Sequence, residues 1–249
     1  MKRLLRDDER LDYLLAEEMR IIQSPSVFSF SLDAVLLAHF TYIPRKKGDI
    51  VDLCSGNGII PLLLSKHTEV PITAVEIQPR LADMARRSVS YNQLAAQITI
   101  LEADLREVTK TLGKEKHQIV TCNPPYFNTP PSSKVNANEH YKIARHEVMC
   151  TLEDTVRVSA ELLRQGGKAS FVHRPDRLVD IMDFMRKYRL EPKRVQFVHP
   201  HLDRDANMVL VEGIKDAKSG VRYLPPIFVH EQNGDYTPLL KEILYGEGK

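Results

Sequence analysis

Compact apolar runs and amphipathic segments alternate through the middle of the chain. Four of the runs are rich in β-branched residues, as buried strands are: Ile50–Leu53, Ile72–Glu76, Ile98–Leu101 and His117–Cys122. Three segments between them repeat apolar residues at helical spacing: Gly58–His67, Pro79–Asn92 and Leu105–Leu112. This strand–helix–strand rhythm predicts right-handed crossovers and a mainly parallel sheet with helices on both faces.

The pattern after residue 150 completes the predicted sheet. It predicts a helix ended by Gly166 and Gly167, then a strand and a second helix: Leu152–Arg164, Lys168–His173 and Pro175–Tyr188. Two further strands, Arg194–His199 and Asn207–Glu212, can pair as an antiparallel hairpin. The expected fold class is therefore α/β, with a seven-stranded, mostly parallel sheet closed by that hairpin.

The two ends of the chain carry weaker patterns. Residues 1–20 are charged and contain leucines spaced as on one helix face, so they predict a helix, followed by an extended stretch to residue 30. Residues 31–215 make the predicted α/β domain, in which Ser31 is a suitable N-cap for a helix. Residues 216–249 predict a C-terminal extension packed on that domain, with an extended segment and a short helix over Pro238–Tyr245.

Acidic and Gly-containing segments stand at the ends of successive strands, where open α/β sheets bind ligands. Gly56 and Gly58 allow the backbone to approach a ligand, and Asp52 before them can meet a cationic or hydroxylated group. Glu76 ends the second strand, where an acid can take both hydroxyls of a ribose. Asp104 follows the third, where a carboxylate can accept from an adenine amino group. Each acid alone is more often a solvated loop residue, but three in succession make a specific pattern.

The fourth strand breaks abruptly into Asn123-Pro-Pro-Tyr126. The Asn123 side-chain oxygen and the Pro124 carbonyl are two acceptors that can hold a planar NH₂ group. Tyr126, with Phe127 in reserve, offers a flat face on which a flipped base or an amide can lie. The same residues are typical of a rigid turn after a strand, and for the motif alone both interpretations stand.

Together these motifs resemble the class I S-adenosylmethionine (SAM) methyltransferases, and among them the amino-methyltransferases with an (Asn/Asp/Ser)-Pro-Pro-(Tyr/Phe) motif. Three more segments resemble the bacterial tRNA(Val) adenine-N6 methyltransferase family: Phe28–Leu37, Ala144–Glu147 and Ala206–Glu212. The resemblance extends from about residue 10 to residue 236 and implies a Rossmann-like SAM methyltransferase fold. Cys54 departs from the family pattern, because it stands where the first glycine of the loop is usual.

The resemblance implies a SAM pocket and an adjoining substrate site. The implied cofactor residues are Asp52, Cys54, Gly56, Gly58, Glu76, Asp104 and Asn123, and the implied catalytic residues are Asn123, Pro124 and Tyr126. Substrate contacts are expected from Pro125, Phe127, Lys142 and Arg145. The last two lie in a long connection, from residue 123 to 150, that we interpret as a substrate lid, although a surface insertion has the same pattern. The implied substrate is an adenine in tRNA, in the anticodon loop of tRNA(Val).

Two other kinds of function remain open from the sequence. The motif suits the planar amide of glutamine as well as adenine, so a protein glutamine or an amino group in rRNA or DNA is an alternative substrate. A DNA-specific enzyme normally has a larger target-recognition domain than this chain can contain. A non-catalytic RNA-binding protein with the same fold is the third interpretation, which the complete set of pocket residues disfavours.

Composition sets limits on these interpretations. The chain of 249 residues is 43% hydrophobic and 27% charged, as globular proteins are, and its net charge of +2 permits nucleic-acid binding without indicating it. It has neither an apolar run of membrane length nor a leader pattern, so we expect a cytoplasmic monomer without a membrane partner. Cys54, Cys122 and Cys150 lack the spacing of a metal site, so we expect them to be small core residues and expect no metal.

Overall fold

The computed structural model describes residues 4–14, 18–27, 31–126 and 150–246. Most of the predicted lid therefore lies outside the described residues, and so do Phe127, Lys142 and Arg145. Within the described ranges, no helix is both long and apolar enough to cross a membrane.

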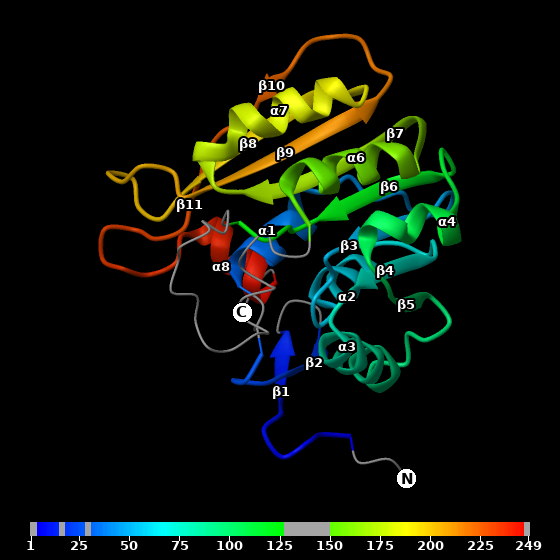
Figure 1. The fold of residues 1–249 in the computed structure, drawn as a ribbon. Helices are drawn as coiled ribbons and strands as arrows, with labels where there is room; N and C mark the ends of the chain where they lie inside the picture. Colours follow the sequence, from blue (N-terminus) through cyan, green and yellow to red (C-terminus); the bar gives the residue numbers. More distant parts are fainter. Residues whose placement is uncertain (1–3, 15–17, 28–30, 127–149, 247–249) are drawn as a thin grey trace, which may run out of the picture.

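A nine-stranded sheet forms the centre of the molecule, in the order β10-β8-β9-β7-β6-β3-β4-β5, with β11 also paired to β8 (Figure 1). Its strands are β3 (Ile50–Leu53), β4 (Ile72–Glu76), β5 (Ile98–Glu102), β6 (His117–Cys122), β7 (Leu163–His173), β8 (Leu190–His199), β9 (Met208–Lys215), β10 (Arg222–Tyr223) and β11 (Ile227–Phe228). Strands β5, β4, β3, β6 and β7 are mutually parallel, and β9 is antiparallel to β7 and β8. The predicted α/β sheet with its closing hairpin is confirmed. The predicted count of seven strands is too low, because the short β10 and β11 were not expected to join the sheet.

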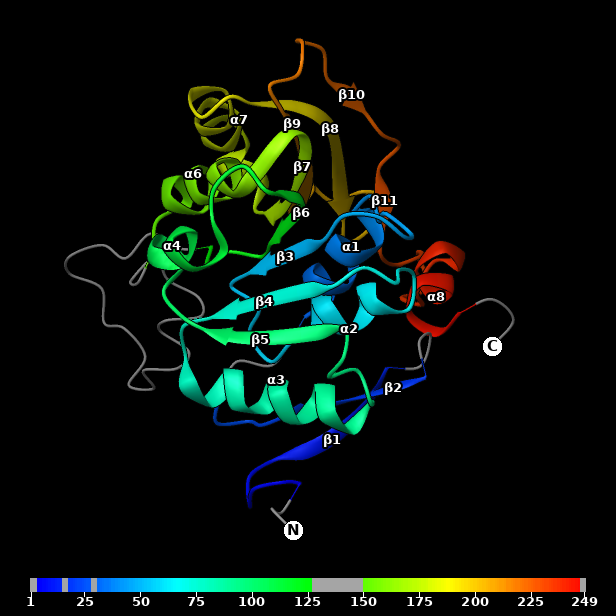
Figure 2. The same cartoon turned by 90° about the vertical axis from the view of Figure 1, so that its right-hand side faces the viewer.

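Helices cover both faces of this sheet (Figure 2). They are α1 (Leu32–Phe40), α2 (Ile59–Ser65), α3 (Pro79–Tyr91), α4 (Val108–Leu112), α6 (Leu152–Leu162), α7 (Leu178–Lys187) and α8 (Pro238–Tyr245). Ile50 of β3 belongs to the apolar cluster of α1, α2 and α8, whereas its neighbour Val51 belongs to the cluster of α6 and α7. Both sides of the central strands are buried, which explains why these strands are continuous apolar runs in the sequence.

The prediction of a helix in the N-terminal segment is wrong. The described residues form a two-stranded antiparallel sheet there, from β1 (Arg10–Leu14) and β2 (Met19–Gln23), which lies beside α3 (Figure 2). Ile22 packs in one apolar cluster with Leu81 of α3, and its backbone N–H donates to Ser88 Oγ at 3.0 Å. Because these partners are distant in sequence, the local leucine spacing could not reveal them.

The sequence predicted that Gly166 and Gly167 end a helix. This prediction is wrong, because both glycines lie inside β7. Helix α6 already ends at Leu162. A Cβ on Gly167 would lie 3.1 Å from the backbone oxygen of Gln118, where the pairing of β6 with β7 shifts its register. Gly166 has a φ of +75°, which favours glycine. The two glycines therefore permit an irregular, close approach of β7 to β6.

The C-terminal segment closes one edge of the sheet. Strands β10 and β11 pair in parallel with β8, and Leu240 of α8 belongs to the same apolar cluster as α1. The predicted helix over Pro238–Tyr245 is confirmed. The domain boundaries near residues 31 and 215 stay predictions, since the N-terminal hairpin and the C-terminal segment both pack on the central body.

Candidate active site

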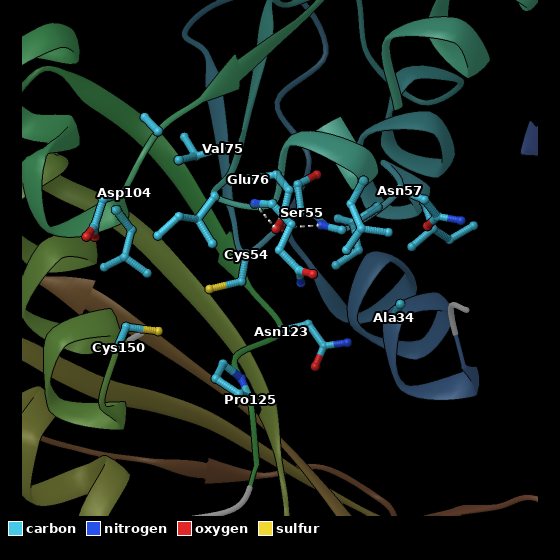
Figure 3. Close-up of a pocket in the computed structure, with 18 residues that line it drawn as sticks. Ala34, Cys54, Ser55, Asn57, Val75, Glu76, Asp104, Asn123, Pro125 and Cys150 are labelled. Carbon is cyan, nitrogen blue, oxygen red and sulfur yellow. Dashed lines mark hydrogen bonds between the residues drawn. The ribbon is translucent and has the colours of Figure 1, made fainter. Parts of the chain in front are cut away.

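A pocket opens at the carboxyl ends of β3, β4, β5 and β6 (Figure 3). It contains about 840 Å³ of empty space that is continuous with solvent. Its polar lining comes from the last residue of β4 and from the loops after these strands: Ser55, Gly56, Asn57, Glu76, Gln78, Asp104 and Asn123. Parallel strands bring their carboxyl ends to one edge of a sheet, so residues far apart in the sequence meet here.

The turn after β3 holds three residues in the left-handed backbone region: Cys54 with φ +57°, Gly56 with φ +58° and Gly58 with φ +86°. Gly56 lines the pocket, and a Cβ added to it would meet no atom within 4 Å. Gly58 is not among the lining residues. A Cβ on Gly58 would lie 3.1 Å from the Cβ of Ala85, so this glycine lets α2 approach α3. Its predicted part in cofactor binding stays a prediction.

Cys54 keeps the glycine-like conformation although it carries a side chain. For a residue with a Cβ, this region costs roughly 1 kcal/mol relative to glycine. We therefore expect Cys54→Gly to have a free energy of unfolding about 1 kcal/mol above that of Cys54→Ala, measured by urea denaturation. Neither variant has a thiol, so equal stabilities would contradict the presence of strain at this position.

Glu76 connects the end of β4 to the turn after β3. Its side chain is buried, and its two oxygens accept hydrogen bonds from the backbone N–H groups of Gly56 and Gln78, each at 2.8 Å. Burial raises the pKa of this carboxyl, against the effect of those N–H donors. Each carboxylate oxygen has a further lone pair, and Glu76 lines the pocket, so it can accept from two hydroxyls of a ligand.

Asp104 also lines the pocket, but it already has strong partners. Its carboxylate accepts from the backbone N–H of Arg106 at 2.9 Å and from the Arg106 guanidinium at 2.5 Å. These hydrogen bonds hold the pKa of Asp104 below its usual value. If Asp104 also accepts from an adenine amino group, as predicted, it must do so with the carboxylate lone pairs that are not already bonded to Arg106.

Asp52 is not at the pocket surface, contrary to what its place at a strand end suggested. It is fully buried and is not among the lining residues. Its Oδ1 accepts from Thr121 Oγ1 at 2.6 Å, and the Ser55 hydroxyl is a second hydrogen-bonding neighbour of the carboxyl. Burial raises the pKa of Asp52 to about 7. Any contact of Asp52 with a cofactor is therefore indirect in this structure.

The raised pKa of Asp52 predicts a pH-dependent cost to stability. Between about pH 4 and pH 7 the folded protein binds more protons at this carboxyl than the unfolded chain does, so stability falls as the pH rises through that window. Asp52→Asn keeps an acceptor for Thr121 and carries no charge. We measure the difference in Tm, variant minus wild type, without ligand. We expect this difference to be more positive at about pH 8 than at about pH 5. A difference that stays constant or reverses would show that Asp52 is not buried as a costly charge.

The Asn123-Pro-Pro-Tyr126 segment leaves β6 at the rim of the same pocket. Asn123 and Pro125 line it, together with Cys54 and Cys150 (Figure 3). Pro124 is buried and is not among the lining residues. Asn123 and Glu76 thus line the same pocket.

Tyr126 is not among the residues that line the pocket, and its hydroxyl connects it to Asn123, which is. The hydroxyl oxygen lies 2.7 Å from Asn123 Oδ1, and the hydroxyl also donates to Asp33 Oδ2. The ring contacts the ring of His173, with centroids 5.0 Å apart. The sequence offered no reason to select Asp33, since an acid in the first turn of a helix is ordinary. Its only signal was its place in the segment Phe28–Leu37.

A family model described as "Methyltransferase small domain" matches residues 18–187, more than half of the chain. The chain belongs to this methyltransferase family. Its carboxyl-edge pocket is where this fold binds its ligand.

Curated relatives of this methyltransferase have a consistent name. A protein of Porphyromonas gingivalis that is 25% identical, over 76% of this chain and 74% of its own length, is named tRNA1(Val) (adenine(37)-N6)-methyltransferase. A protein of Shewanella amazonensis with the same name is 36% identical over 42% of this chain and 44% of its own length.

Solved structures agree with the fold. A structure of a predicted O-methyltransferase from Agrobacterium tumefaciens has a TM-score of 0.69 and 26% identity, and covers 87% of this chain and 97% of that one. Geranyl diphosphate C-methyltransferase from Streptomyces coelicolor, solved with S-adenosyl-L-homocysteine, has a TM-score of 0.56 and 11% identity, covering 73% of this chain and 76% of that one. The expected Rossmann-like methyltransferase fold is therefore confirmed.

Methyltransferases of this kind take their methyl group from SAM, and the pocket of this methyltransferase fits that cofactor. Ser55 lines the pocket, and its hydroxyl is also a hydrogen-bonding neighbour of the buried Asp52 carboxyl. Gly56 leaves open space where a Cβ would stand. Glu76 lines the pocket with carboxylate oxygens of the kind that can accept from ribose hydroxyls.

The three cysteines of this methyltransferase are core residues, as predicted: Cys122 and Cys150 are buried in one apolar cluster, and Cys54 packs against it. The Cys54 thiol lies against those of Cys122 and Cys150. The hydrogen bond with Cys122 and burial raise the pKa of Cys54, against the lowering effect of the hydrogen bond with Cys150. Figure 3 shows the sulfurs of Cys54 and Cys150 directed toward one another at the pocket wall. Within the described part of the chain, no group of His, Cys, Asp and Glu is arranged to hold a metal ion. Cys54 and Cys150 therefore present neutral thiols to the pocket, and Cys122 is not among the lining residues.

Proposed function

We propose that this methyltransferase transfers a methyl group from SAM to the exocyclic N6 of an adenine in tRNA, in the anticodon loop of tRNA(Val). The observation that carries the proposal is the position of Asn123, whose side-chain amide opens onto the pocket bordered by Gly56 and Glu76. An amide oxygen beside the methyl donor is suited to hold an amino group. The names of the curated relatives support adenine 37 of tRNA1(Val) as the target.

The proposed chemistry depends on alignment. The lone pair of an adenine amine is delocalised into the ring, so the amine is a weak nucleophile. Asn123 Oδ1 and the Pro124 carbonyl would accept hydrogen bonds from its two N–H groups and turn the lone pair toward the donor. The ring of Pro124 fixes φ and so stiffens the position of that carbonyl. SAM supplies a methyl group on a sulfonium, and the protein contributes proximity and electrostatic support.

The base would enter from the carboxyl edge of the sheet. A base in a loop is already partly unstacked, so extruding it costs less than extruding one from a duplex. Arg174 and Arg177 follow β7 at this edge, next to His173, which contacts Tyr126. The exposed segment 45–47, with one arginine and two lysines, precedes β3 and so belongs to the opposite edge. We therefore propose Arg174 and Arg177, rather than that segment, as phosphate contacts of a monomeric cytoplasmic enzyme.

Methyl transfer from labelled SAM to separate pools of tRNA, rRNA and protein tests the proposal. We expect label in tRNA. Label in protein, recovered as methylglutamine, would instead support the alternative in which the same motif holds an amide. No saturable SAM binding, together with no transfer to any pool, would support a non-catalytic RNA-binding protein.

A further inference from the structure

The Tyr126 hydroxyl lies between two polar side chains, Asp33 and Asn123. It contacts Asp33 Oδ2, and its oxygen is 2.7 Å from the near end of the Asn123 amide. Asp33 is 6% exposed, so solvent does not compete for these contacts. The three side chains form a chain of hydrogen bonds that ends at the pocket.

Asp33 is held in place independently of Tyr126. It is the second residue of α1, and its Oδ1 accepts from Ser31 Oγ at 2.5 Å and from the backbone N–H of Ala34 at 2.8 Å. Its Oδ2 is left for the tyrosine. Six other residues of helix α1 are buried in the core, so the helix is held firmly and the position of the Asp33 carboxylate is fixed.

The count of protons decides the direction of the hydrogen bonds. A hydroxyl has one proton to give, and a carboxylate only accepts, so Tyr126 donates to Asp33. Its contact with Asn123 then satisfies both groups only if the tyrosine oxygen accepts, and the available donor is the Asn123 NH₂ group. The near end of the amide is Oδ1 as placed, and a half-turn about the Cβ–Cγ bond puts Nδ2 there in nearly the same space.

We infer that Asp33 is a positioning residue that acts through Tyr126 to hold the Asn123 amide with its NH₂ group toward the tyrosine and its oxygen toward the pocket. This inference rests on the proposed function. In that orientation Asn123 Oδ1 is free to accept from an amino group. In the reverse orientation the amide would present N–H donors to the substrate and would repel an amine. Asp33 thus selects for amino substrates without touching them.

A double-mutant cycle separates this role from ordinary helix stabilisation. Asn at position 33 can donate as well as accept, so Asp33→Asn removes the fixed direction while keeping the shape. We expect it to lower kcat about tenfold, with little change in KM for tRNA or in SAM affinity. Tyr126→Phe should have a similar effect. Adding Asp33→Asn to Tyr126→Phe should cause no further loss, because the connection is already broken.

Glu153→Gln is the matched control. Glu153 is also the second residue of a helix, α6, and also accepts from a tyrosine hydroxyl, that of Tyr188 at 2.6 Å, but it is not at the pocket. We expect this variant to keep the wild-type kcat. A tenfold loss from Asp33→Asn in both the wild-type and Tyr126→Phe backgrounds would overturn the inference, and so would a wild-type kcat in Asp33→Asn.

A spectroscopic readout keeps the inference distinct from the proposed function. In protein labelled with ¹⁵N at asparagine, the side-chain NH₂ signals of Asn123 report its hydrogen bond without any substrate. We expect these signals to shift, and their exchange with solvent to become faster, in both Tyr126→Phe and Asp33→Asn. Unchanged signals would overturn the inference even if the wild type methylates tRNA. Shifted signals in a protein that methylates no tRNA would leave Asp33 as the positioning residue and refute only the proposed substrate.

Discussion

Asn123→Ala should bind SAM with nearly wild-type affinity and transfer methyl groups at least about 100-fold more slowly. The side chain lines the pocket, and in the proposed reaction its oxygen accepts from the amine, so its loss should remove that acceptor and leave the Glu76 contact with SAM in place. An acceptor that aligns a weak nucleophile acts mainly in the transition state, so the loss should appear in kcat.

Two measurements check this expectation on one preparation of protein. Calorimetric titration gives the SAM affinity, and single-turnover methylation of tRNA gives the transfer rate. Near-wild-type transfer by Asn123→Ala would mean that Asn123 is only part of a rigid turn, and the proposed alignment would be wrong. A large loss of SAM affinity would instead place the side chain under the cofactor.

Glu76→Ala should have the opposite effect, a loss of SAM affinity of about 1–3 kcal/mol. The carboxylate borders the cofactor space, and it also fixes the turn after β3 through Gly56. Loss of both functions should weaken binding, whereas transfer at saturating SAM should fall much less.

Glu102→Ala is the matched control for this experiment. Glu102 pairs directly with Glu76 across β4 and β5, but it is exposed, forms an ion pair with Arg86 and does not line the pocket. We expect it to keep wild-type SAM affinity in calorimetric titration. Equal affinities of the two variants and the wild type would contradict the placement of the cofactor against Glu76.

The central strands could be predicted almost to the residue, whereas the roles of the acids at their ends could not. Asp52 pairs directly with Thr121 across β3 and β6, so it is inside the sheet and its hydroxyl partner is a cross-strand neighbour. Glu76 extends one residue past the last pair between β3 and β4, and its side chain reaches the pocket. Asp52 pairs with Ala74, two residues before Glu76, so two residues along the strand separate an acid inside the sheet from one that lines the pocket. Strand register is not visible in local sequence.

Contacts between distant segments account for the other differences. Asp33 and Tyr126 are 93 residues apart, and nothing near either residue indicates the hydrogen bond between them. Ile22 likewise meets Leu81 of α3 only after the chain has folded, so the N-terminal leucines predicted a helix where a hairpin forms. Cys54 was recognised as a departure from a glycine position, but that it keeps the left-handed conformation follows only from the folded turn.

The proposed function is tested most directly by identifying the methylated nucleoside. The protein would be incubated with SAM and a tRNA(Val) transcript, and the RNA would be digested and analysed by mass spectrometry. A transcript with guanine in place of adenine 37, the position in the relatives' name, is the control. We predict N6-methyladenosine from the first transcript, none from the second, and none from the first with Asn123→Ala. Methylation at a ring nitrogen of adenine, or equal N6-methyladenosine from both transcripts, would contradict the proposed reaction or the proposed target.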